Sequence, residues 1–271
     1  MRNWSIEFPS IENPELLSFA LEESKQRGIP IHRVDQASGV RMLSASELQE
    51  MTALARDASV ELVLSITTRN SWDIRPDPHG GDQLLGESAF ASALAELRAC
   101  ATSGAGGVTI TDVGLLLVAG ELAQAGELNG LRIKTGAAIA PRNAAGARLY
   151  ESIGANSINV MGASTVEDLA AMRAVLGPDT TLDVYVEVPD QLGGGLRYHE
   201  LAEIVRAAAP VMLKIGLQHA PRLFLYGEHL RPVAEQVIRE RVRRTELVIA
   251  ELERSGVDVY AETYGAPVNS W

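Results

Sequence analysis

The stretch "GVTITDVGLLLVAGELAQAGELNGLRIKTGA", residues 107–137, contains two short apolar runs on either side of a leucine-rich segment. The runs at 107–113 and 131–137 have the length and composition of buried strands, whereas the apolar residues at 114–125 have helical spacing. A strand, a helix and a second strand in this order are typical of a βα repeat with parallel strands. This stretch therefore predicts an α/β fold.

The same order of elements recurs along the whole chain, at intervals of roughly 25–30 residues. Strands are predicted at 3–8, 30–35, 60–68, 107–113, 131–137, 156–162, 181–188 and 210–217. Helices are predicted at 13–27, 45–57, 87–102, 114–125, 142–153, 165–175, 196–208 and 229–255. Several helix starts have capping signals, including boxes from Ser44 to Glu47 and from Ser164 to Glu167.

Eight βα units in 271 residues predict a (β/α)8 TIM barrel. A doubly wound open sheet more often has a glycine-rich fingerprint after its first strand, and this chain has "FPSIENPE" (8–15) at that place. We expect a single TIM-barrel domain over residues 1–271, with residues 256–271 as a C-terminal extension.

The composition is that of a globular protein, with 46% hydrophobic and 22% charged residues. A net charge of −11 argues against nucleic acids and membranes as partners, because binding to either relies on clustered Lys and Arg. The single cysteine, Cys100, excludes an internal disulfide and an iron–sulfur cluster. Because no signal peptide or membrane-spanning run is visible, a cytoplasmic location is expected. We expect a small-molecule substrate and no cofactor, with a divalent metal and homo-oligomerisation left open.

Two of the three lysines in the chain, Lys134 and Lys214, lie within predicted strands. Strand alternation places the neighbouring aliphatic residues on one face and each lysine on the other, with a glycine two residues later. We therefore expect both lysines to point into the barrel. A buried ammonium needs an anionic partner or a lowered pKa. The carboxylates whose positions suit such pairing are those of Glu7, Asp35, Glu61, Asp112, Asp183 and Glu187.

Three roles are open for these lysines: an internal salt bridge, a Schiff-base nucleophile, and substrate anion binding or proton transfer. Lys214 is the stronger candidate for catalysis, with Glu187 or Asp183 tuning its amine. Lys134 and Arg132 are expected to hold negative charge on the substrate.

Two long connections follow predicted strands, where βα loops of a barrel form the catalytic face. Residues 69–87 are a candidate lid, in which Arg75 and His79 are candidate substrate-binding residues. The segment "PDQLGGGLRY" (189–198) places Gly193, Gly194 and Gly195 just before a predicted helix. This segment is interpreted either as an anion site built from backbone N–H groups or as a flexible turn.

The histidines do not show the HxH or HExxH spacing of a strong zinc motif. His219 follows the last predicted strand, at the expected catalytic mouth, and is a candidate general acid or base. Alternatively, His219, Glu187 and Asp112 could form an oxygen-rich metal site.

The segments "GVTITDVGLLLVAGEL" (107–122) and "LRIKTGAAIAPRNAAGARLYESIGANSINV" (131–160) resemble the U32 peptidase-like family. The resemblance covers residues 107–162 and implies a barrel fold. It also implies peptide hydrolysis or, in cluster-binding members, hydroxylation of RNA or quinone precursors. This chain lacks the cysteines for a cluster and reads "NVMGAST" (159–165), so that Asn159 and Ser164 stand where many members carry an Arg-Glu pair.

Three functions follow from these observations as alternatives. The first is a lyase of the aldolase type, acting on a small anionic or carbonyl-containing metabolite, in which Lys214 forms a Schiff base or acts as general acid or base and Asn159 contacts the substrate. The second is a U32-like hydrolase, with or without a metal. The third is a non-catalytic barrel that serves as a binding subunit.

Overall fold

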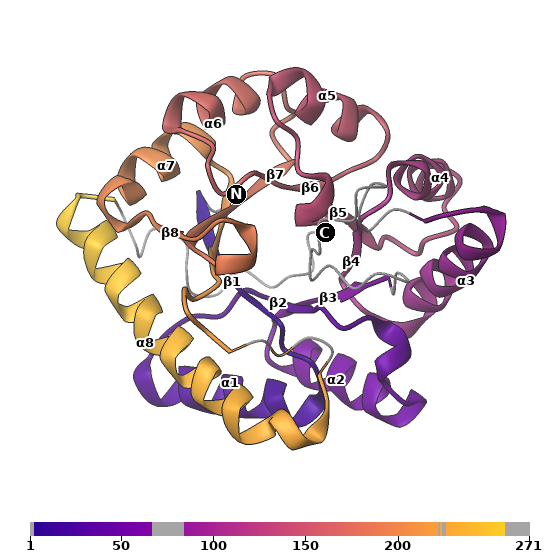
Figure 1. Ribbon diagram of the computed structural model, residues 1–271, viewed down its shortest axis with the longest axis horizontal. Helices are drawn as coiled ribbons and strands as arrows, with labels where there is room; N and C mark the ends of the chain where they lie inside the picture. The colour runs from indigo at the N-terminus through magenta and orange to yellow at the C-terminus, as the bar shows by residue number, and fades with distance from the viewer. Residues whose placement is uncertain (1–2, 67–83, 222, 224–225, 258–271) are drawn as a thin grey trace.

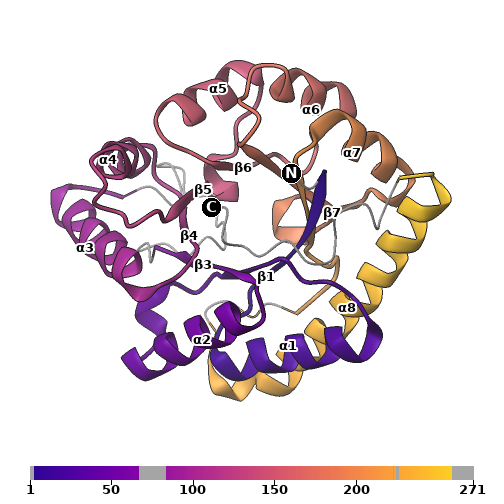
Figure 2. The same cartoon turned by 180° about the vertical axis from the view of Figure 1, so that it is seen from behind.

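The computed structural model describes residues 3–66, 84–221, 223 and 226–257, and shows a closed (β/α)8 barrel. Figures 1 and 2 show the strands inside a single ring of helices, seen from its two sides. The predicted TIM barrel is thereby confirmed. The candidate lid, apart from residues 84–87, and the C-terminal extension, apart from residues 256–257, lie outside the described residues.

In the described part of the chain, eight parallel strands form the barrel. They are β1 (Trp4–Pro9), β2 (Arg33–Gln36), β3 (Glu61–Ser65), β4 (Gly107–Ile110), β5 (Arg132–Thr135), β6 (Ser157–Asn159), β7 (Thr181–Val188) and β9 (Val211–Ile215). The barrel closes where β9 pairs with both β1 and β7. A short strand, β8 (Gly195–Leu196), runs antiparallel to the end of β7 and was not predicted. Around the barrel from β1 to β9, neighbouring strands are consecutive in sequence, except that β8 intervenes between β7 and β9.

Among the described residues, eight helices cover the outside of the barrel and match the predicted helices in number and order. They are α1 (Pro14–Arg27), α2 (Ala45–Asp57), α3 (Glu87–Ser103), α4 (Val113–Gln124), α5 (Ala144–Ser152), α6 (Val166–Arg173), α7 (Leu201–Ala208) and α8 (Arg231–Arg254). None of the described helices is both long enough and apolar enough to cross a membrane.

Local signals explain where several helices begin. Asn13 caps α1 by accepting from the Leu16 amide, and Pro14 occupies the first helical position. The capping box from Ser44 to Glu47 is confirmed at α2. The box predicted from Ser164 to Glu167 is wrong by one residue, because Thr165 is the N-cap of α6 and pairs with Asp168. Both registers place a hydroxyl three residues before a carboxylate, so the sequence pattern fits either one.

The predicted start of α7 is also corrected. Residues 196–200 were predicted as its first turns, but β8 and a 3-10 turn (Tyr198–Glu200) occupy them, and α7 begins at Leu201. Gly193 and Gly194 precede β8 and Gly195 is its first residue, and all three have φ angles between 69° and 134°, a region that favours glycine. They reverse the chain so that β8 can pair with β7.

Two kinds of side chain fill the interior. Aliphatic residues on the outer faces of the strands pack against the helices and form the main apolar core. The inner faces hold buried charged residues instead: Glu7, Arg33, Asp35, Glu61, Lys134, Asp183 and Lys214. We call these seven residues the interior ion cluster. The barrel is therefore polar along its axis, unlike the aliphatic interior that is usual for this fold.

Candidate functional site

Lys134 and Lys214 both point into the barrel, as strand alternation predicted, and are only 1% and 2% exposed. The Nζ of Lys134 lies 2.5 Å from Oε1 of Glu7 and 2.9 Å from Oδ2 of Asp35. A carboxylate oxygen of Asp183 lies 3.7 Å from the same nitrogen. Lys134 is thus surrounded by three carboxylates from three other strands.

Lys214 shares the carboxylate of Glu7, because its Nζ lies 2.9 Å from the same Oε1 atom. It also donates to Oδ1 of Asn159 at 2.8 Å. The ring of Tyr185 faces the ammonium, with 4.6 Å between Nζ and the ring centroid. The amide nitrogen of Asn159 donates to the Thr135 carbonyl at 2.6 Å, which fixes the orientation of the accepting oxygen. Lys214 therefore has a carboxylate, an amide oxygen and an aromatic face around its amine.

Arg33 is the third cation of the cluster, and sequence reasoning did not identify it. Its Nε donates to Glu61 at 2.7 Å, and its Nη1 lies 3.3 Å from Glu7 and 3.2 Å from Asp183. The same Nη1 donates to the hydroxyl of Ser157 at 2.9 Å. Arg33 is on the same face of its strand as Asp35, a signal that could have identified it. Its guanidinium links carboxylates from three strands into one network.

The charges within the cluster shift the pKa values of its members in opposite directions. Burial alone would raise the pKa of Glu7, but Lys134, Lys214 and Arg33 outweigh burial and hold it well below its usual range. Burial would lower the pKa of Lys214, but the nearby negative charge, chiefly that of Glu7, raises it above its ordinary value. The amine of Lys214 is therefore an ammonium and Glu7 a carboxylate at neutral pH.

The structure corrects the expected position of Glu187. Strand alternation predicted that this residue faces the lysines, but a β-bulge between Tyr185 and Glu187 shifts the register of β7 against β9. Glu187 consequently pairs with Ile215, whose side chain faces the helices. Its carboxylate accepts from the Tyr198 hydroxyl at 2.5 Å and lies 3.2 Å from Arg244 of α8. Of the two acids expected to tune a lysine, only Asp183 belongs to the interior ion cluster.

Arg132 is also placed differently from the expectation. It is the first residue of β5, so it lies at the N-terminal end of the strand, opposite the end that carries the βα loops. Its Nε lies 3.5 Å from Glu61 and its Nη2 donates to the Asn156 carbonyl. Its guanidinium therefore contacts Glu61 and does not lie beside the βα loops, where a substrate is expected.

Among the predicted substrate-binding residues, Asn159 is brought to the cluster, where it accepts from Lys214. Gly193 and Gly194 lead into β8 and Gly195 is its first residue, so the three glycines do not directly precede a helix. Arg75 and His79 lie outside the described residues.

The alternative metal ligands are far from forming one site. Asp112 is the N-cap of α4, where it accepts from the Leu115 amide and, through its second oxygen, from the Leu84 amide. His219 is 84% exposed at its side chain, and its ring nitrogen lies 3.3 Å from Asp190. Glu187 has the separate partners described above. Within the ranges that the structure covers, no group of three His, Cys, Asp or Glu side chains is arranged to hold a metal ion.

Glu12 is a second residue that sequence reasoning missed. It lies in the loop after β1, at the end of the barrel that carries the βα loops, and is only 2% exposed. Its Oε2 accepts from the Ser38 amide at 2.8 Å, whereas its Oε1 has no hydrogen-bond partner among the described residues. Burial, with a further contribution from the charge of Asp35, raises the pKa of Glu12 to about 7. A carboxyl with this pKa can accept or release a proton at neutral pH.

No protein-family model matches the sequence, and no curated protein matches it significantly. Three solved structures with a similar fold are the YdjI aldolase from Escherichia coli K12, the U32 peptidase Mk0906 and a dimeric archaeal Rubisco from Hyperthermus butylicus. The YdjI aldolase is 13% identical with a TM-score of 0.52, and the match covers 96% of this chain and 94% of that one. The U32 peptidase is 14% identical with a TM-score of 0.50, and the match covers 80% of this chain and 94% of that one. The Rubisco is 11% identical with a TM-score of 0.52, and the match covers 93% of this chain and 65% of that one.

At such identities these similarities concern the fold alone. They agree with the closed barrel described above, and the resemblance to the U32 peptidase family is confirmed at this level.

Proposed function

We propose that this chain is a barrel enzyme of the lyase type that acts on a small metabolite with a carbonyl or carboxylate group. Lys214 is the residue on which the proposal depends. Its ammonium is buried, held by Glu7 and Asn159 at 2.9 Å and 2.8 Å, and has a raised pKa. A fixed positive charge in a buried site can stabilise an oxygen that gains negative charge during a reaction.

The raised pKa of Lys214 favours proton donation or charge stabilisation over Schiff-base formation. A Schiff base requires the neutral amine as nucleophile, and lysines that form one usually have a lowered pKa. In this barrel the carboxylate of Glu7 stabilises the ammonium instead. Lys214 is therefore proposed to stabilise or protonate the oxygen of the substrate carbonyl as the neighbouring bond breaks.

Glu12 is proposed as the proton acceptor in the same reaction. Its pKa of about 7 is suited to a general base, and its Oε1 has no hydrogen-bond partner among the described residues, so a substrate hydroxyl that reached it would find a free acceptor. In an aldol-type cleavage, Glu12 takes the proton of the β-hydroxyl group, the carbon–carbon bond breaks, and the electron pair moves to the carbonyl oxygen beside Lys214. The ammonium of Lys134 donates to the carboxylates of Glu7 and Asp35 and holds both in place.

One observation favours a second function, a binding barrel without catalysis. The contacts described for both ammonium groups are to protein side chains, so the interior ion cluster could serve stability alone. Activity measurements distinguish the two functions, because only the enzyme needs Lys214 for turnover.

The test is a turnover screen with 2-oxo acids, hydroxy acids and aldehydes, followed by Lys214→Met. Loss of a charge that stabilises the transition state is expected to lower kcat by about 100- to 1,000-fold. Lys25→Met is the matched control, because Lys25 is the remaining lysine and is exposed on α1. Absence of turnover throughout the screen, or unchanged kcat in Lys214→Met, would refute the enzyme proposal.

Borohydride reduction in the presence of substrate separates the two roles of the lysine. A covalent adduct on Lys214, identified by mass spectrometry, would replace the ammonium mechanism with a Schiff base. The ammonium mechanism predicts that no adduct forms while turnover still depends on Lys214.

A further inference from the structure

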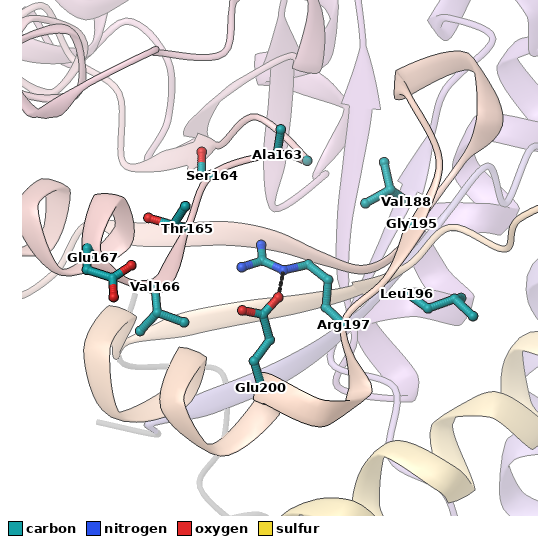
Figure 3. A pocket seen from close by; sticks show the side chains of 11 residues that line it. Ala163, Ser164, Thr165, Val166, Glu167, Val188, Gly195, Leu196, Arg197 and Glu200 are labelled. Carbon is teal, nitrogen blue, oxygen red and sulfur yellow. Dashed lines mark hydrogen bonds and ion pairs between the residues drawn. The ribbon is translucent and has the colours of Figure 1, made fainter.

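A separate pocket of about 390 Å³ lies between two loops on the side of the barrel where the strands end. One wall is residues 162–167, which connect β6 to α6, and the other includes Gly195, Arg197 and Glu200 after β7. Figure 3 shows the side chains of Arg197 and Glu200 facing the loop at Ala163, Ser164 and Thr165. None of the residues of the interior ion cluster lines this pocket.

The guanidinium of Arg197 is buried in the pocket wall, and one of its nitrogens has no hydrogen-bond acceptor among the described residues. The residue is 6% exposed, and its Nε donates to Oε1 of Glu200 at 2.6 Å. Its Nη1 has no hydrogen-bond partner within the part of the chain that the structure describes. In Figure 3 the free end of the guanidinium points into the space between the two loops, away from the bond to Glu200. A buried cationic donor without an acceptor is costly, and a ligand with an acceptor group would remove that cost.

The opposite wall contains the N-terminus of α6. The capping box uses the Thr165 hydroxyl to accept from the Asp168 amide. The amides of Val166 and Glu167, in the first turn, have no acceptor within the helix, as at any helix start. These N–H groups and the helix dipole favour negative charge at this end. The two walls therefore present donors of hydrogen bonds toward the same space from two different elements.

We infer that this pocket binds the carboxylate group of a small organic acid. The free edge of Arg197 and the first-turn amides of α6 would donate hydrogen bonds to its two oxygens. Glu167 and Glu200 also line the pocket, and their negative charges oppose a doubly charged phosphate more strongly than a singly charged carboxylate. This site goes beyond the proposed function, because binding there needs neither lysine.

The experiment is an NMR titration of the ¹⁵N-labelled protein with succinate semialdehyde, a monocarboxylate, and in parallel with inorganic phosphate. Saturable shifts of the Val166 and Glu167 amides with the carboxylate, and weaker binding of phosphate, are expected. Tighter binding of phosphate would overturn the carboxylate assignment. Absence of saturable shifts at these amides with both probes would overturn the site itself.

Two variants test the parts of the site separately. Arg197→Met removes the buried cation and is expected to weaken carboxylate binding by about ten-fold or more. Glu167→Gln changes an exposed residue, so folding should be unaffected, and it is expected to tighten binding roughly two- to five-fold.

If a thermal melt shows that Arg197→Met does not fold, Glu167→Gln still tests whether the pocket binds a carboxylate. Unchanged or weaker carboxylate binding in Glu167→Gln would contradict the proposed electrostatics. Activity of Lys214→Met is measured independently, so failure of this site leaves the lysine proposal untouched.

Discussion

The buried carboxyl of Glu12 makes a specific prediction about stability and pH. An acid whose pKa is higher in the folded state than in the unfolded state binds its proton more tightly when the protein is folded. The contribution of Glu12 is therefore most favourable below about pH 4.5 and is lost as the pH rises through about 7. A rise in pKa from 4.5 to about 7 corresponds to about 3 kcal/mol in the free energy of unfolding.

The substitution Glu12→Gln tests this prediction. The glutamine side chain keeps an oxygen that can accept from the Ser38 amide, but it cannot ionise. Any pH-independent packing effect of the substitution is the same at every pH. The informative quantity is therefore the difference in free energy of unfolding between the variant and the original protein. Between about pH 4.5 and pH 8, the free energy of unfolding of Glu12→Gln should rise by about 3 kcal/mol relative to that of the original protein.

Urea denaturation followed by circular dichroism measures this difference at a series of pH values. Glu22→Gln is the control, because Glu22 is exposed on α1 and its substitution should leave the pH profile nearly parallel to that of the original protein. Parallel profiles of Glu12→Gln and the original protein from pH 4.5 to 8 would show that burial does not raise the pKa of Glu12.

Two further predictions concern the interior of the barrel. Lys134→Met removes a cation that lies near three buried carboxylates, and is expected to lower the free energy of unfolding by about 3–5 kcal/mol, whereas Lys25→Met should have little effect in the same urea titration. Burial, assisted by the charge of Glu96, raises the pKa of the Cys100 thiol to about 12, so this cysteine should react with a thiol reagent at about pH 8 only as fast as the protein opens. Rapid labelling of the native protein would contradict this burial.

The fold could be predicted because its signal is local and repeated. Each strand and helix has its own period of apolar residues, and eight repeats at similar spacing indicate a barrel even where individual ends are misplaced. The inward direction of Lys134 and Lys214 was predictable for the same reason. Alternation within one short strand is sufficient to assign a face.

The remainder of the candidate site depends on contacts between strands. Arg33 becomes central only because Glu7, Glu61 and Asp183 from three other strands meet it inside the barrel. Glu187 was assigned to the wrong face because a bulge in β7 reverses the alternation after Tyr185. A bulge is set by the pairing of β7 with β9, about thirty residues away, and leaves no periodic trace in the sequence.

The closure of the barrel through β9 has a consequence for how the chain is made. β1 pairs with β2 on one side, but its other partner, β9, begins at Val211, about two hundred residues later. During synthesis on the ribosome, one edge of β1 therefore stays open until the last strand has emerged. Glu7 lies on that strand, and its neighbour Lys214 arrives equally late. Until β9 is synthesised, the nascent chain therefore has an unpaired edge on β1, and the carboxylate of Glu7 is still exposed to water. A chaperone would be of most use during this interval.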